Sequence, residues 1–240
     1  MKLTLAMLNA IAGRQVDRAN AGSLLDGLDT YPAGIEAPHR LAHYVAQIMH
    51  ESGALRYDRE IASGTAYEGR ADLGNTEPGD GPRFKGRTPI QITGRSNYRQ
   101  FREWCKAANL DPPNFEAYPE LVLTDPWEGL GPVWYWTTRG VNALADVGDL
   151  RGITRKINGG YNGLPDRQRY YVRSALVMLG YAPDDVAGFQ AKAGLPADGI
   201  AGPLTMNALH VALRGSEAVV ATEVPPAPSL LGRLIAALFG

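Results

Sequence analysis

The sequence has almost no cysteine, no long apolar run and almost no net charge. Its one cysteine, Cys105, cannot form a disulfide within the chain, so the protein can fold in a reducing compartment. Cys105 follows Trp104 in a stretch of helical spacing, where a buried packing thiol is commoner than a reactive one. No apolar stretch reaches the roughly 20 residues that a bilayer-spanning helix needs.

The first eight residues faintly resemble a signal peptide. Asn9 and Arg14 interrupt this apolar start, so we expect a first amphipathic helix and no secretion signal. Lysine and arginine number 24 against 25 acidic residues, and these charges are dispersed. A nucleic-acid-binding protein normally shows a basic face or arm, so we expect no nucleic-acid partner. We also expect a monomer.

What is present is a chain of 240 residues that predicts one medium-sized helical domain with a small appendage. The clearest helix covers 39–52, where Leu41, Tyr44 and Ile48 recur at helical spacing. Residues 64–88 have no period and are rich in Gly, Asp and Pro, which predicts a long loop. A short hairpin fits near 83–93. Further helices are predicted over 96–109, 126–138, 149–157 and 166–179.

The composition divides the chain into four parts. Residues 1–182 form the predicted main domain, and 183–214 form a compact helical unit. Three prolines and few aromatic residues mark 215–228 as a linker. The apolar segment 229–240 predicts a short helix, which would either touch a membrane surface or dock on protein.

Glu51 is the first candidate catalytic residue. It lies on the same helical stripe as Ile48, Tyr44 and Leu41, so it ends an apolar face. Partial desolvation there favours the protonated carboxyl, which could donate a proton to a glycosidic oxygen. The alternative is an ordinary carboxylate at a helix C-terminus, a position that opposes the helix dipole.

Glu60 follows nine residues later, beyond the probable helix end at Gly53, where the chain could turn back. Two carboxyl groups across a cleft are what glycoside hydrolysis needs. Taken from spacing alone, a surface ion pair with Arg56 or Arg59 is the commoner arrangement, so this alternative stays open.

Several separated sequence motifs favour the catalytic interpretation of Glu51 and Glu60. The run Phe84–Tyr98 closely resembles the signature of the glycoside hydrolase family 19 chitinases and their phage endolysin relatives. Agreement extends in order over about residues 3–180. The agreeing blocks are His50–Gly53, Glu60, Trp134–Trp136, Val141–Asp146, Ile157–Gly160 and Asp166–Tyr171.

This resemblance implies a mainly α, lysozyme-like, two-lobed fold and an inverting mechanism without cofactor or metal. It implies that Glu51 is the general acid, that Glu60 is the general base, and that Thr93 helps to hold the attacking water. The remaining implied roles belong to substrate contacts and one supporting cation. Gln91, Asn97 and Asn158 would bind N-acetyl sugars, Tyr98 would line the cleft, and Arg167 would lie near Glu60 to keep it ionised.

The sequence departs from the plant pattern at Thr88, at Gly94-Arg95 and in lacking the disulfide cysteines, which indicates the bacterial and phage branch. Residues 185–209, with the stretch Asp198–Pro203, resemble a peptidoglycan-binding type 1 repeat. About thirty residues match, so this unit either binds the wall or is a remnant packed on the main domain.

His39 and His43 stand four apart and raise the alternative of a metal site, but there is no HExxH pattern. For the whole chain we expect an endolysin that is made in the host cytoplasm and cuts peptidoglycan glycan strands at the periplasmic wall. The alternatives are a chitinase and a non-catalytic wall-binding phage component.

Overall fold

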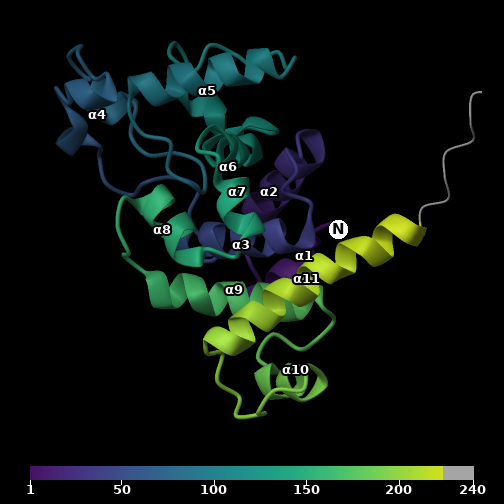
Figure 1. Ribbon diagram of the computed structural model, residues 1–240. Helices are drawn as coiled ribbons and strands as arrows, with labels where there is room; N and C mark the ends of the chain where they lie inside the picture. The colour runs from purple at the N-terminus through teal and green to yellow at the C-terminus, as the bar shows by residue number, and fades with distance from the viewer. Residues whose placement is uncertain (224–240) are drawn as a thin grey trace, which may run out of the picture.

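The computed structural model describes residues 1–223, with side chains for residues 1–215, and is built of helices (Figure 1). The α-helices are α1 (Leu5–Ala12), α2 (Arg18–Thr30), α3 (Pro38–Glu51), α4 (Asp80–Arg83), α5 (Arg95–Ala107), α6 (Trp127–Thr138), α7 (Val141–Asp146), α8 (Leu150–Asn158), α9 (Leu164–Met178), α10 (Val186–Lys192) and α11 (Pro203–Glu223). Three short 3₁₀ helices are η1 (Thr65–Tyr67), η2 (Ala71–Leu73) and η3 (Pro119–Leu123). The mainly α prediction is confirmed.

The predicted long loop over 64–88 contains η1, η2 and α4, whose short lengths explain why no period marks them. Within the described residues no strand forms where the hairpin was expected. Two isolated antiparallel bridges join Arg59 to Arg87 and Arg87 to Ile92.

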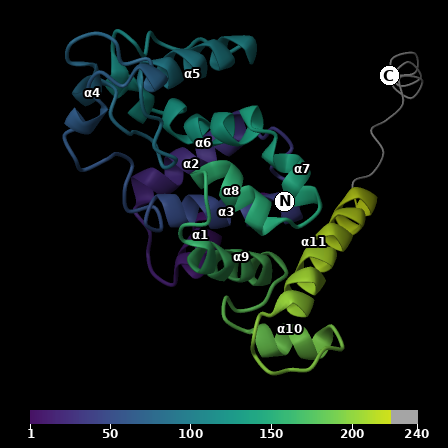
Figure 2. The same ribbon diagram turned by 60° about the vertical axis from the view of Figure 1, so that its left-hand side comes forward.

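Helix α3 lies at the centre of the molecule. Its sequence begins with Pro38, which suits the first helical position, and every residue from Pro38 to Met49 except Arg40 is buried. It packs against α9, α7 and α11, while α4 and α5 lie on the opposite side of the molecule from α9 (Figures 1 and 2). A helix with so much of its surface buried is a rigid support, so its last residue, Glu51, has a fixed position.

Helices α2 and α6 touch backbone to backbone. A Cβ atom on Gly27 would lie 2.2 Å from the carbonyl carbon of Gly129, and one on Gly129 would lie 1.7 Å from the oxygen of Ser23. Only glycine permits this approach, which fixes α6 beside the first half of the core.

The turn after α3 uses an unusual backbone. Gly53, Ala54 and Leu55 all have positive φ, at 59°, 58° and 59°, a region that non-glycine residues rarely adopt. Surrounding groups hold it in place: Arg14 Nη2 donates to the carbonyls of Gly53 and Ala54, and Asn20 Nδ2 donates to that of Leu55. The turn directs the chain from Glu51 towards Glu60, and such strain persists only where neighbours enforce it.

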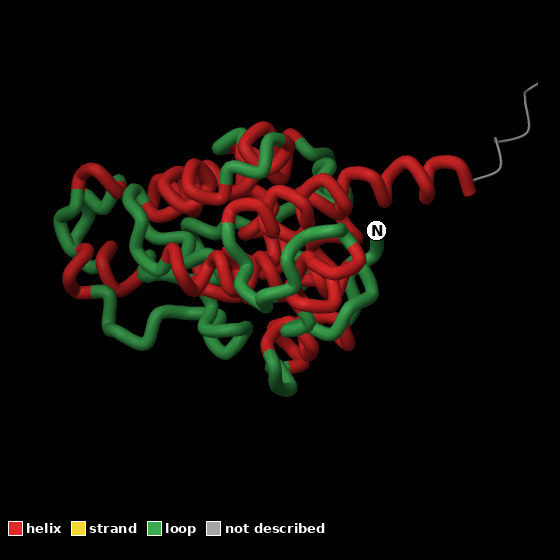
Figure 3. Tube along the Cα trace, turned by 60° about the horizontal axis from the view of Figure 1, so that its bottom comes forward, coloured by secondary structure: helices red, strands yellow, loops and turns green. Residues whose placement is uncertain are grey.

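The C-terminal helices pack directly on the main body. Phe189, Leu209 and Leu213 belong to the same hydrophobic cluster as α3 and α9. Helix α11 then projects past the body (Figure 3). It continues to Glu223, so residues 215–223 of the predicted linker are helical. Gly215 and Ser216 do not stop it, because extending a formed helix costs little.

Residues 224–228 and the apolar segment 229–240 lie outside the described residues. Of the helices that the structure describes, none has the length and apolar content to cross a bilayer. Cys105 is buried on α5, and burial raises the pKa of its thiol to about 12, in agreement with the packing role predicted for it.

Candidate active site

Glu51 is the last residue of α3, and its carboxylate is held by a buried arginine. Arg167 Nη2 donates to Glu51 Oε1 at 2.5 Å. The Arg167 side chain has no exposed surface, while that of Glu51 is 22% exposed. Nη1 of Arg167 donates to Gln47 Oε1 at 2.5 Å and Nε donates to the Asn162 carbonyl at 3.3 Å. The guanidinium therefore ties the Glu51 carboxylate to both α3 and the start of α9.

This geometry corrects one sequence prediction. Arg167 was expected beside Glu60, but it lies on Glu51. The reason is packing: α9 runs along α3, so a residue in the first turn of α9 reaches the end of α3. Glu60 belongs to a later segment with other neighbours.

The α8–α9 loop closes over the same helix end. His50 Nδ1 lies 2.7 Å from Asp166 Oδ2, and Asp166 also accepts a hydrogen bond from Arg169. A Cβ on Gly163 would lie 2.1 Å from the His50 ring, so only glycine fits at this contact. The segment 158–167 is thereby fixed relative to Glu51.

Tyr135 lies in the same neighbourhood. Its hydroxyl donates to the Ile157 carbonyl at 2.9 Å, and the Arg139 guanidinium carbon lies 3.3 Å from its ring centroid. Burial raises the pKa of Tyr135, and the nearby Glu51 carboxylate adds to that effect. The neighbouring Trp134 and Trp136 are buried in the core, while Tyr135 is half-buried beside Glu51.

Glu60 is held by backbone and by a second tyrosine. Its N–H donates to the Gly86 carbonyl at 2.9 Å, and the Gly86 N–H donates back to Glu60 Oε2 at 3.3 Å. Tyr67 donates its hydroxyl to Glu60 Oε1 at 3.1 Å. Burial raises the pKa of Tyr67, with the Glu60 charge as the next cause. Tyr67 lies in the predicted loop, where no sequence period marked it.

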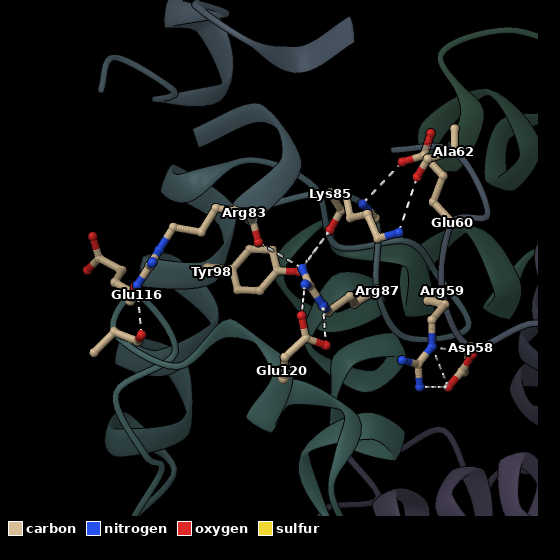
Figure 4. A network of polar contacts seen from close by, with 12 residues as sticks. Asp58, Arg59, Glu60, Ala62, Arg83, Lys85, Arg87, Tyr98, Glu116 and Glu120 are labelled. Atoms are coloured by element: carbon tan, nitrogen blue, oxygen red, sulfur yellow. Dashed lines mark hydrogen bonds and ion pairs between the residues drawn. The ribbon is translucent and has the colours of Figure 1, made fainter. Parts of the chain in front are cut away.

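The surface ion pair considered for Glu60 does not form. Arg59 pairs with Asp58 at 2.8 Å, and neither Arg56 nor Arg59 pairs with Glu60 within the described residues (Figure 4). Arg59 and Glu60 are neighbours in the chain, but Arg59 binds Asp58 while Glu60 binds Tyr67 and Gly86.

The side chains of Gln91 and Thr93 lie next to Gly86, the glycine that binds Glu60. A Cβ on Gly86 would lie 2.4 Å from Gln91 Oε1 and 3.2 Å from Thr93 Oγ1. Thr93 Oγ1 donates to the Gln91 carbonyl at 2.9 Å, and Asn97 Nδ2 donates to the Thr93 carbonyl at 2.7 Å. The structure thus brings Glu60, Gln91, Thr93 and Asn97 together around one short backbone segment.

Tyr98 does not line a cleft, which is a second correction. It has no exposed surface, and burial raises the pKa of its hydroxyl. Its hydroxyl donates to the Lys85 carbonyl at 2.8 Å and accepts from Arg87 at 2.7 Å (Figure 4). Tyr98 lies on the inward face of α5, against Phe84, so its role is to fix the loop that carries Gly86.

Asn158 is exposed at the end of α8, one residue beyond the carbonyl that Tyr135 binds.

His39 and His43, considered above as metal ligands, have other partners. His39 Nε2 lies 2.8 Å from Asp146, and His43 stacks on Tyr171 with ring centroids 4.2 Å apart. Within the described residues, no cluster of three metal-ligating side chains occurs.

The site therefore contains two carboxyl groups in different settings. One sits at a helix end beside a buried cation, and the other on an irregular segment beside a phenol and a backbone N–H. A pair of this kind, with amide and hydroxyl side chains nearby, can perform general acid and general base steps on a glycosidic bond.

Comparison with known proteins gives curated relatives of one kind over about half of the chain. A protein of Haemophilus influenzae named "Glycosyl hydrolase family 19 domain-containing protein" is 33% identical over 120 residues, covering 49% of this chain and 55% of that protein. An endochitinase of Arabidopsis thaliana is 33% identical over 127 residues, covering 53% of this chain and 41% of that protein. The chain thus spans about half the length of the curated relatives it matches.

Solved structures agree with this similarity. A bacterial family 19 chitinase superposes with a TM-score of 0.60 at 21% identity, covering 76% of this chain and 97% of that one. Chitinase C from Streptomyces griseus gives 0.59 at 22% identity, with 75% and 77% covered. At these identities the similarity shows the fold. Residues 184–209 match the family model described as "Putative peptidoglycan binding domain".

Proposed function

We propose that this chain is a chitinase-like glycoside hydrolase of family 19 and that it hydrolyses β-1,4 glycosidic bonds of bacterial peptidoglycan. One observation favours peptidoglycan over chitin as the substrate. The segment that matches a peptidoglycan-binding family, residues 184–209, packs on the same helices α3 and α9 that hold Glu51 and Arg167. A wall-binding unit in this place would keep the glycan close to the carboxyl pair.

In the proposed mechanism Glu51 donates its proton to the glycosidic oxygen as the bond to the anomeric carbon breaks. Glu60 takes a proton from a water molecule, whose oxygen attacks the anomeric carbon from the opposite face, so the configuration inverts. The Tyr67 hydroxyl and the Gly86 N–H orient the Glu60 carboxylate, and Thr93 helps to place the water. Arg167 holds the carboxyl of Glu51 in one orientation.

Three amides complete the proposal. Gln91 and Asn97 lie near Thr93, and Asn158 lies on the side of Glu51, so they can bind N-acetyl groups on either side of the bond that is cut. We further propose an endolysin role, with synthesis in the host cytoplasm and action at the periplasmic wall. The wall-binding match supports that role.

Mass spectrometry of digestion products tests the proposal. Wild type and Glu51→Gln are incubated separately with purified peptidoglycan and with chitin oligosaccharides. We expect muropeptides from the wild type alone, and the new reducing-end sugar identifies the bond. Cleavage of neither polymer by a folded wild type contradicts the proposal and favours a non-catalytic wall-binding component.

A chitinase is the second candidate. The curated relatives from Arabidopsis thaliana are named endochitinases, and the superposed structures are chitinases. Cleavage of chitin without cleavage of peptidoglycan would select this candidate and leave residues 184–209 as a remnant.

A further inference from the structure

Helix α8 carries a basic face that the proposed mechanism does not use. Its residues Leu150, Ile153 and Thr154 are buried against the body, while its cationic residues Arg151, Arg155 and Lys156 are exposed. Arg151 and Arg155 stand four residues apart and so share one side of the helix. Nine residues thus concentrate three cations in a chain whose net charge is only −1.

These cations differ from most of the other basic residues near the site. Arg59, Arg87, Arg95, Arg167 and Arg169 each pair with a carboxylate. Across the described part of the chain, no carboxylate forms an ion pair with any of the three cations of α8. Asp149, the nearest acid in sequence, caps the helix by accepting from the Gly152 N–H. The basic face is therefore open to an anionic ligand.

This face is attached to the acid side of the site. Tyr135, beside Glu51, donates to the Ile157 carbonyl of α8, and the loop after α8 supplies the carbonyl of Asn162 to Arg167. Both views of the ribbon draw α8 between α6 and α9 and next to α3 (Figures 1 and 2). Arg167 in turn binds Glu51. The C-terminal end of α8 is therefore linked to the proposed proton donor through Tyr135 and Arg167.

Tyr161 adds an aromatic surface to the basic face. The ring is 45% exposed, and the guanidinium carbon of Arg151 lies 4.6 Å from its centroid. An aromatic ring can cover the apolar face of a sugar, while a guanidinium binds carboxylates. The two chemistries together fit a glycan that carries acidic substituents.

We propose that Arg151, Arg155, Lys156 and Tyr161 form a specificity site for the carboxylates of peptidoglycan stem peptides next to the bond that is cut. Chitin is uncharged, whereas stem peptides carry free carboxylates, so this site selects between the two polymers. The inference rests on the proposed function, because it assigns a substrate feature to the same site.

The test measures binding of the full chain carrying Glu51→Gln, so that no substrate is consumed. The probes are peptidoglycan freed of phosphate polymers, the same peptidoglycan with its carboxylates amidated, and chitin. The double change Arg155→Gln/Lys156→Gln is compared with Arg99→Gln/Lys106→Gln, which removes two exposed cations from α5 on the other side of the molecule. Arg155→Lys serves as the charge-keeping control.

We expect the α8 change to weaken binding to intact peptidoglycan about tenfold and to flatten its salt dependence. Binding to amidated peptidoglycan and to chitin should not change, and the α5 change and Arg155→Lys should have little effect. An equal loss on all three probes, no loss on intact peptidoglycan, or a loss only on walls that keep their phosphate polymers overturns the inference. If wild type cleaves no glycan, the proposed function is refuted. The binding comparison does not require cleavage, so it still tests the basic face separately.

Discussion

The two carboxyl groups of the site are held in contrasting ways. Glu51 ends a buried helix and binds a fully buried arginine, so its position depends on the packing of α3 against α9. Glu60 lies on an irregular segment and is held by one N–H and one phenol, contacts that belong to a loop. Damage on the Glu51 side should therefore reduce folding stability, and damage on the Glu60 side should mainly reduce activity.

The largest effect should follow from removing either carboxyl. Glu51→Gln and Glu60→Gln should each lower turnover by about 10²- to 10⁴-fold, which is the usual contribution of a general acid or base. Both variants should stay folded, since the amide is isosteric. Turnover on a soluble substrate and a thermal unfolding curve check this. Retained turnover in Glu60→Gln would show that another group activates the water.

Arg167→Ala tests the stability of the Glu51 side. It should cost about 3–5 kcal/mol of unfolding free energy, because it leaves Gln47 and Glu51 without their buried partner. Denaturant unfolding measures the cost. A loss under about 1 kcal/mol would mean that the pair behaves like an exposed one, contrary to its burial.

Gly86→Ala tests the Glu60 side. The new Cβ would displace the ends of the Gln91 and Thr93 side chains, both of which can move, so the unfolding midpoint should change little. Turnover should fall about 10–100-fold, because misplacing a catalytic group by an ångström has effects of that size. Gly22→Ala, where a Cβ meets nothing within 4 Å and φ, as at Gly86, is not positive, is the backbone control. Equal effects in the two variants would contradict the assignment.

The free energy of unfolding should decrease as the pH is lowered, because of buried histidines in a third region, where α11 packs on α3. Burial lowers the pKa of His43 to about 3, and burial also lowers the pKa of His210. His39, Asp146 and Arg214 face the same cluster.

The folded-state pKa of His43 lies below the unfolded value of 6.5, so its contribution is complete above pH 6.5 and is lost as the pH falls towards 3. The slope should reach about 1.4 kcal/mol per pH unit for each such histidine. In His43→Phe, which keeps a ring against Tyr171, the slope should be smaller. An unchanged slope in chemical denaturation from pH 7 to 4 would refute this origin.

The smallest effect should come from Tyr67→Phe. Removing the hydroxyl deletes one of the two hydrogen bonds that the Glu60 carboxylate accepts. Turnover should therefore fall about 3–10-fold, which corresponds to one ordinary hydrogen bond. KM should stay within about twofold, because Glu60 acts on water and not in sugar binding. A change in KM alone would place Tyr67 in substrate binding.

Much of the fold could be predicted because helical spacing is local. The helix over 39–52 and the helices near 96–109, 126–138, 149–157 and 166–179 correspond to α3, α5, α6, α8 and α9. The proximity of Gln91 and Thr93 to Glu60 followed from the family resemblance, which matched the run 84–98 and, as a separate block, Glu60.

What could not be predicted depends on contacts between distant segments. Arg167 was placed with the wrong carboxylate because only the packing of α9 on α3 decides its partner. Tyr98 was placed in a cleft because a motif does not say which side of α5 faces the core. Tyr67 was missed because its role depends on how the loop over 64–88 folds back.

The most direct test of the central claim is the configuration of the first product. Proton NMR follows the new reducing end within seconds of adding wild-type protein to a soluble peptidoglycan glycan, before mutarotation mixes the anomers. With Glu51 as acid and Glu60 as base, a β-linked substrate should give the α-anomer first. Initial appearance of the β-anomer would mean a double displacement, in which a carboxylate or the sugar's own N-acetyl oxygen attacks the anomeric carbon, and it would contradict the roles assigned to the pair.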